Sequence, residues 1–164
     1  MPGKAAFDTN IFIYSIGGGH DETLGSAQTR AQAIWENRKA AIARTIVAEP
    51  SIVSIQVFNE FANVARRKLG LKADEIAAIL EDLSRVHTVV GLSWETTRLA
   101  LEVSKIGEGK GPDGILRPGN FSTYDSLIIA AALLAGCDTL YTEDNQTGVI
   151  VGGRLELINP FDCH

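Results

Sequence analysis

Short apolar runs alternate with longer amphipathic stretches along most of the chain. The apolar runs predict strands within residues 5–14, 51–54, 87–93, 137–142 and 154–161, the first followed by a turn. Apolar residues at helical spacing predict helices over residues 26–44, 56–70, 72–86, 94–107 and 122–136. Strands that alternate with helices indicate an α/β domain with a mostly parallel sheet covered on both faces. Residues 1–164 show no repeat and no break in composition, so we expect one domain.

Several segments depart from this simple alternation. Residues 108–120 are rich in Gly and Pro and predict an unusually long loop, between Gly107 and Phe121. Ile34 and Trp35 would suit a partner surface, but their helical spacing favours packing in the core. The apolar stretch 127–136 has about half of the ~20 residues that a membrane-spanning helix needs, so we expect a buried helix.

Composition narrows the possible functions. The chain has 20 acidic and 15 basic side chains, which argues against a protein held on nucleic acid by bulk positive charge. An enzyme that holds cations in an acidic pocket remains open. Cys137 and Cys163 form no CxxC motif, and the N-terminus lacks a secretion signal, so we expect reduced thiols and a cytoplasmic protein.

Four acidic residues from four elements are expected to meet at the carboxyl-terminal edge of the sheet, where α/β folds bind ligands. They are Asp8, Glu60, Asp125 and Asp144. Carboxylates that lie this close repel one another unless a cation neutralises them. Oxygen ligands of this kind suit Mg²⁺ or Mn²⁺, which bind through a few carboxylates, water and substrate phosphate.

Each acid also has a simpler interpretation. Asp8 would accept backbone hydrogen bonds in the turn DTN, and Asp125 would complete a capping box that begins at Ser122. Glu60 would be a solvated helix residue, although its spacing from Val57 places it toward the apolar side. Asp144 would be an ordinary loop acid. The convergence of all four favours a site.

Other motifs carry less information. The segment GGGH lacks the spacing of a phosphate-binding loop, and no GxSxG motif is present. His20, His87 and His164 have no metal-ligand spacing, and His87 is expected to be packed or solvated rather than catalytic. The run ARRK, residues 65–68, is most simply the charged last turn of a helix, although it would also suit contacts with RNA phosphate.

The chain resembles a PIN-domain ribonuclease, and more narrowly the VapC-type toxins of bacterial toxin–antitoxin systems. Four segments carry the resemblance, in the right order and over nearly the whole chain: FDTNIFIY, SIVSIQVFNEFANVARRKLG, STYDSLIIAAALLAGCDTLYTED and LELINPF. The resemblance implies a three-layer α/β/α sandwich with a central mostly parallel sheet. It also implies a Mg²⁺- or Mn²⁺-dependent endoribonuclease, an antitoxin partner and a homodimer.

The family pattern also assigns roles to individual residues. It makes Asp8, Asp125 and Asp144 metal ligands and Glu60 a ligand or the residue that orients the attacking water. Its supporting polar residues correspond to Thr9, Asn10 and Thr142. Two departures stand out: the loop before Asp125 is longer than usual, and a further acid found after Asp144 in some relatives is missing. The first affects substrate choice and the second weakens the case for a second metal.

Two other function classes are compatible with an α/β fold. One is a PIN-like module that binds RNA or a partner without cleavage, although such a surface has no reason to concentrate carboxylates. The other is a phosphoryl-accepting signalling domain, which usually pairs its acids with a lysine after a late strand. No lysine follows Lys110, so this class is the least favoured.

Overall fold

Parallel strands form the centre of the sheet and place the amino-terminal strand in its middle. The computed structural model describes residues 4–105, 108–110, 116–118, 121–144 and 147–162. The strand order is β3-β2-β1-β6-β8-β7-β4-β5. The parallel members are β1 (Ala5–Phe7), β2 (Ile52–Ser54), β3 (Thr88–Val90), β6 (Thr139–Tyr141) and β8 (Leu155–Ile158). These strands lie within the apolar runs that predict them.

The other edge of the sheet is antiparallel and departs from the sequence prediction. There β7 (Val149–Val151) pairs with β8 and β4 (Glu108–Lys110), and β4 pairs with β5 (Leu116–Pro118). The stretch 108–120 was expected to be a loop, so that prediction is wrong for β4 and β5. Pro118 is tolerated in β5 because this strand lies at the edge of the sheet, where ladder hydrogen bonds are incomplete. Residues 106–107, 111–115 and 119–120 lie outside the described residues.

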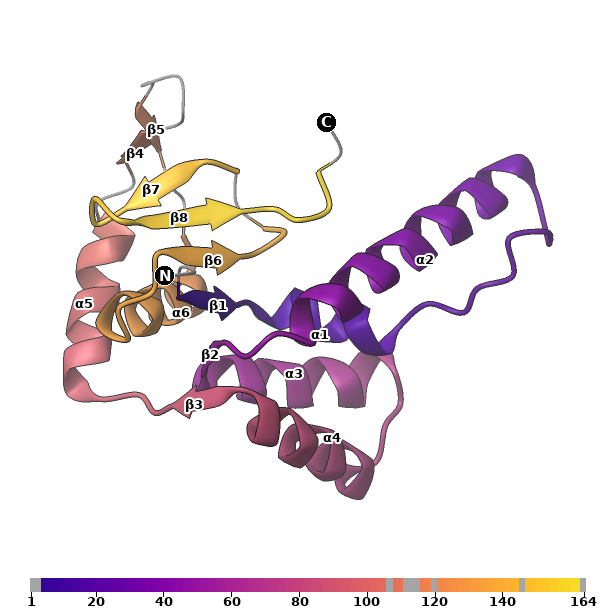
Figure 1. Ribbon diagram of the computed structural model, residues 1–164, viewed down its shortest axis with the longest axis horizontal. Coiled ribbons are helices and arrows are strands. Elements are labelled where there is room, and N and C mark those ends of the chain that lie inside the picture. The colour runs from indigo at the N-terminus through magenta and orange to yellow at the C-terminus, as the bar shows by residue number, and fades with distance from the viewer. Residues whose placement is uncertain (1–3, 106–107, 111–115, 119–120, 145–146, 163–164) are drawn as a thin grey trace.

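Helices flank the sheet, as the alternating pattern predicts (Figure 1). They are α1 (Thr9–Ile16), α2 (Ala27–Val47), α3 (Ile55–Lys68), α4 (Ala73–Val86), α5 (Trp94–Lys105) and α6 (Thr123–Leu134). Helix α3 ends before Gly70, whose φ of 69° suits glycine. None of the helices in the described part of the chain is long and apolar enough to cross a membrane.

Helix α1 replaces the turn expected after the first strand. Asp8 is extended and its side chain accepts a hydrogen bond from the Thr9 amide, so it caps the helix. Ile11 and Phe12 are then fully buried on the inner face of α1. The run of β-branched and aromatic residues favours a strand locally, but the cap and this burial decide for a helix.

Helix α2 extends away from the sheet, and its apolar residues do not pack as expected (Figure 1). Ile34 is 51% exposed and Trp35 is 37% exposed, so the prediction that they pack in the core is wrong. The buried face of α2 consists of Ala33, Lys39, Ala40 and Ala43. The amino-terminal end of α2 projects beyond the other helices, whereas the small residues Ala40 and Ala43 allow its carboxyl-terminal half to approach the domain closely (Figure 1).

The core lies between the sheet and the helices and fixes the carboxyl ends of the parallel strands. Its largest fully buried side chains include Phe7, Phe12, Phe61, Leu140, Leu157 and Phe161. Because β1 lies between β2 and β6, the residues after these three strands are neighbours. Asp8 follows β1, α3 follows β2, and Thr142 follows β6. This edge is the place where ligands bind in parallel α/β sheets.

Candidate functional site

Asp8 lies at the centre of this edge and is 5% exposed. One carboxylate oxygen accepts a hydrogen bond from the Thr9 amide at 2.6 Å, and the other accepts one from the Thr142 hydroxyl at 2.7 Å. Burial raises the pKa of Asp8 to about 6, with the charges of Asp144 and Asp125 adding to the effect and the two hydrogen bonds opposing it. The Asp8 carboxyl is therefore close to half protonated near pH 6.

The residues after β6 bring a second carboxylate to the same place. Thr142 is fully buried, and its backbone amide donates to the Ile158 carbonyl at 2.9 Å. Asp144 accepts a hydrogen bond from the Asn10 side chain at 2.7 Å. Burial and the charges of Asp125 and Glu143 raise the pKa of Asp144, while Asn10 and Lys68 lower it. Asp144 therefore experiences the charge of at least one other acid of the candidate site.

Glu60 projects from α3 and reaches the start of α1. Its carboxylate accepts hydrogen bonds from the Thr9 hydroxyl at 3.1 Å and from the Gln56 amide at 2.9 Å. The side chain is partly buried, in line with its position toward the apolar side of the helix. Thr9 thus links Glu60 to Asp8, because its amide bonds to one acid and its hydroxyl to the other.

Asp125 combines both interpretations of its sequence motif. It completes a capping box at the start of α6, in which the Ser122 hydroxyl accepts from the Asp125 amide at 3.1 Å. In return, its carboxylate accepts from the Ser122 amide at 3.2 Å and from the Ser122 hydroxyl at 2.8 Å. The Asp125 charge nevertheless raises the pKa of both Asp8 and Asp144. We call Asp8, Glu60, Asp125 and Asp144 the acidic rim.

The acidic rim supplies only oxygen donors, the kind that Mg²⁺ and Mn²⁺ prefer. Repulsion among Asp8, Asp125 and Asp144 is the chemistry that a divalent cation relieves. Within the described residues, however, no three acidic, histidine or cysteine side chains are grouped closely enough to hold a metal as they stand. Each carboxylate turns instead to its own hydrogen-bond donor. The donor set therefore fits the ion in type but, among the described residues, is not arranged around a common point.

A second polar cluster adjoins the acidic rim and was not found from the sequence. Glu143 accepts a hydrogen bond from the Tyr14 hydroxyl at 2.5 Å and forms an ion pair with Lys39. The predicted helix over residues 26–44 contains Lys39, but nothing in its spacing sets it apart from a solvated lysine. Its partner follows 104 positions later in the chain, so no local pattern connects the two.

His87 has the packed role expected of it. It is 3% exposed, its Nδ1 lies 2.9 Å from the Ser51 hydroxyl, and its ring contacts Phe7 and Phe12. Burial lowers the pKa of His87, which favours the neutral ring. Its contacts are those of a core residue, so the acidic rim has no histidine from this position.

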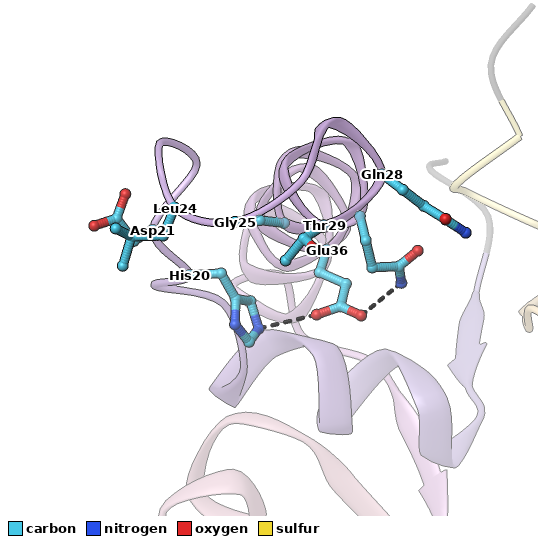
Figure 2. Close-up of a pocket in the computed structure, with 9 residues that line it drawn as sticks. His20, Asp21, Leu24, Gly25, Gln28, Thr29 and Glu36 are labelled. Carbon is cyan, nitrogen blue, oxygen red and sulfur yellow. Dashed lines mark hydrogen bonds and ion pairs between the residues drawn. The ribbon is translucent and has the colours of Figure 1, made fainter.

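A separate cavity of about 600 Å³ lies between the loop after α1 and the amino-terminal half of α2. Figure 2 shows His20 and Glu36 pointing toward each other there, with their nearest atoms 3.0 Å apart. Gln32 also donates a hydrogen bond to Glu36, at 2.6 Å. Asp21, the other acid of this cavity, accepts hydrogen bonds from the amide and hydroxyl of Thr23, and neither acid belongs to the acidic rim.

Comparisons with known proteins agree with this architecture. The PIN domain family model matches residues 5–149. Among solved structures, VapC20 of Mycobacterium tuberculosis, described as a toxin that cleaves the sarcin–ricin loop, is 17% identical with a TM-score of 0.53, covering 86% of this chain and 90% of that chain. VapBC2 from Rickettsia felis, in a structure with a DNA fragment from its promoter, is 18% identical with a TM-score of 0.47. This match covers 85% of this chain and 87% of that chain. No curated protein sequence matches.

Proposed function

The chain belongs to the PIN domain family, and from this premise we propose that it is a Mg²⁺- or Mn²⁺-dependent endoribonuclease of the VapC toxin type. The observation that carries the proposal is that Asp8, Asp125 and Asp144, carboxylates from three different elements, lie close enough at one edge of the sheet for their charges to repel. Fold stability alone does not explain why these repelling carboxylates lie together. Binding of a divalent cation that contacts a phosphodiester would explain it.

Asp8, Asp125 and Asp144 are the residues that would hold the ion in this proposal. A bound Mg²⁺ or Mn²⁺ would lower the pKa of the attacking water and offset the charge that develops on the phosphate. Glu60 would orient that water and accept its proton, because Thr9 and Gln56 fix the direction of its carboxylate. Thr142 keeps Asp8 turned toward the edge of the sheet by donating to it.

The substrate is proposed to lie along α3. Residues Asn63, Val64, Arg67 and Lys68 line a shallow cavity of about 160 Å³ on this helix. Arg67 and Lys68 are exposed and have no carboxylate within ion-pair distance among the described residues. Lys68 is also close enough to Asp144 to lower its pKa. Cations beside the acidic rim would bind the phosphates that flank the cleaved bond.

The description of VapC20 as a toxin supports a regulated enzyme. We therefore propose that a cognate antitoxin covers the acidic rim, presenting a basic side chain to the carboxylates, and that the toxin forms a homodimer. A toxin of this kind would act in the cytoplasm.

The test is RNA cleavage by the purified protein with Mg²⁺ or Mn²⁺, compared with Asp8→Asn and Asp125→Asn. Both substitutions should lower the rate by at least about a hundredfold, since each removes a charged ligand. The products should carry 5′-phosphate and 3′-hydroxyl ends. Asp74→Asn, an exposed acid in the first turn of α4, is the matched control and should cleave normally.

Equal cleavage by all variants would disprove the assignment of the acidic rim. RNA binding that is as strong in EDTA as in Mg²⁺, with no cleavage under any condition, would instead identify a non-catalytic binding module.

A further inference from the structure

The three residues after β6 are each tied to α1 or to its cap. Thr142 donates to Asp8, and Asp144 accepts from Asn10. Between them, Glu143 accepts from the Tyr14 hydroxyl at 2.5 Å. Asn10 and Tyr14 are four residues apart and therefore lie on one face of α1. Two consecutive acids of the loop are thus held by two consecutive turns of one helix.

Lys39 of α2 supports this arrangement from the other side. Its ammonium group forms an ion pair with Glu143 and lies 3.3 Å from the Tyr14 hydroxyl. The Lys39 side chain is 11% exposed and that of Glu143 is 23% exposed. The ammonium also lies over three aromatic rings, at 4.7 Å from Tyr14, 5.3 Å from Trp35 and 5.5 Å from Phe161.

These surroundings keep Lys39 charged. Burial by itself lowers the pKa of Lys39, but the ion pair with Glu143 and the Tyr14 hydroxyl raise it above its ordinary value. The three rings present their negative faces to the cation. Removing Lys39 would leave the partly buried Glu143 carboxylate without its counter-charge and held only by the Tyr14 hydroxyl, which is unfavourable. Glu143 would then rotate toward solvent and release the loop.

The consequences of such a release would extend to the acidic rim, because Glu143 directly precedes Asp144 in the chain. We propose that Lys39 is a positioning residue, which acts through Glu143 and Tyr14 to hold Asp144 in place for metal binding. This inference rests on the proposed function. It extends that function to α2, a helix that contributes no residue to the acidic rim.

If Lys39 served only to pack α2 against the domain, its charge would not matter to residues 142–144. The carboxyl-terminal half of α2 is already anchored by Ala40 and Ala43, which are 1% and 0% exposed. An apolar side chain of similar length at position 39 would keep this packing and lose only the charge. Lys39→Met should therefore fold, with its effect concentrated at residues 142–144.

The experiment compares the wild type with Lys39→Met, Lys39→Arg and Glu143→Gln. Mn²⁺ affinity is measured by isothermal titration calorimetry, and hydrogen–deuterium exchange is measured on peptides that contain residues 139–144. Lys39→Met should weaken Mn²⁺ binding by about tenfold or more and increase exchange at the loop. Lys39→Arg should restore most of the affinity. Arg38→Met removes a neighbouring exposed cation of α2 that forms no ion pair within the described part of the chain, and it should change neither quantity.

A double-mutant cycle tests whether Lys39 acts through Glu143. Lys39→Met combined with Glu143→Gln leaves no unpaired carboxylate, so the double variant should bind Mn²⁺ more tightly than Lys39→Met alone. Independent, additive effects would contradict the proposed connection. Glu143→Gln is nearly isosteric, and a loss of Mn²⁺ affinity in this variant is expected even if Lys39→Met proves unstable.

The outcomes separate this inference from the proposed function. A wild type that binds no Mn²⁺ would overturn the proposed function and the inference with it. A wild type that binds Mn²⁺, with unchanged affinity and unchanged loop exchange in both Lys39→Met and Glu143→Gln, would overturn the inference alone. On RNA, the positioning role predicts a lower kcat with little change in KM.

Discussion

At the scale of single residues, the acidic rim changes the usual dependence of stability on pH. Burial and the neighbouring charges raise the pKa of Asp8 from 3.8 to about 6. The folded state therefore binds this proton more tightly than the unfolded state does. The resulting stabilisation is present in full below the pKa of the unfolded chain and is lost as the pH rises through about 6.

Asp8→Asn should consequently stabilise the metal-free protein at neutral pH while it abolishes cleavage. An asparagine amide accepts from the Thr9 backbone without a charge, and the expected gain at about pH 7.5 is about 1–3 kcal/mol. The gain should shrink at about pH 4.5, where Asp8 is largely protonated in the folded wild type. Chemical denaturation of both proteins in EDTA at the two pH values measures it. A difference that is independent of pH would contradict the shifted pKa.

The acids of the candidate site were predictable from the sequence, but their hydrogen-bond partners were only partly so. Asp8 and Asp144 follow apolar strands, and the fold class alone places the ends of such strands together. Thr9, Asn10 and Thr142 are adjacent to these acids and were found with them. Lys39 and Tyr14 were missed, because their roles arise from packing between helices that no local periodicity encodes.

At the scale of elements, the start of α6 serves both the fold and the candidate site. Asp125 accepts from the Ser122 amide as part of the capping box and contributes its charge to the acidic rim. The two roles depend on different partners. The cap needs Ser122, whereas the rim needs only the Asp125 carboxylate.

Substitutions at Ser122 and Asp125 should separate these two roles. Ser122→Ala should cost about 1 kcal/mol of stability, the usual value of a lost N-cap, and leave RNA cleavage nearly intact. Asp125→Asn should cost a similar or smaller amount and lower cleavage by at least about a hundredfold. Thermal unfolding and cleavage rates of the two variants test this, and equal loss of cleavage in both would show that Asp125 acts through the helix cap.

Two neighbouring arginines at the carboxyl-terminal end of α3, Arg66 and Arg67, allow a similar comparison. Glu60, Asn63 or Val64, and Arg67 recur at intervals of three or four residues, so they follow one face of the helix. Arg67 lies about 10 Å along the axis from Glu60, or about three nucleotides of a stacked strand. Arg66 occupies the same turn but points about 100° away.

Arg67→Gln should weaken binding of a labelled single-stranded RNA of about 12 nucleotides, while Arg66→Gln should have little effect. One lost phosphate contact should reduce the slope of log K against log salt by about 0.7. Fluorescence anisotropy with Asp8→Asn as the background prevents cleavage during the titration. An equal effect of both substitutions would indicate nonspecific attraction to the end of α3.

The elements themselves were predicted unevenly, for identifiable reasons. Long amphipathic helices such as α3 and α4 were found because tertiary burial reinforces their periodic pattern. Helix α1 was missed since its β-branched residues favour a strand until the Asp8 cap and the core decide otherwise. The strands β4, β5 and β7 were missed because each has only three residues, and β4 and β5 contain Gly or Pro, so none shows a clear alternating pattern.

At the scale of the whole molecule, a divalent cation should stabilise the fold by relieving repulsion in the acidic rim. Saturation at about one hundred times the dissociation constant corresponds to about 2.7 kcal/mol. For a chain of this size the melting temperature of the wild type should rise by about 5–10 °C with Mn²⁺. EDTA should reverse the rise and Asp8→Asn should abolish it. Differential scanning calorimetry measures this, and an equal rise in Asp8→Asn would place the ion elsewhere.

The central place of β1 has a consequence for synthesis of the chain. Ala5 is among the first residues made, yet it pairs with Thr139, and Asp144 follows five positions later. A ribosome that has completed α6 has therefore already produced Asp8, Glu60 and Asp125, but the strand that joins them to Asp144 is still missing. If the proposed nuclease site needs Asp144, it stays incomplete until β6 and the residues after it have been made and the sheet has closed around β1.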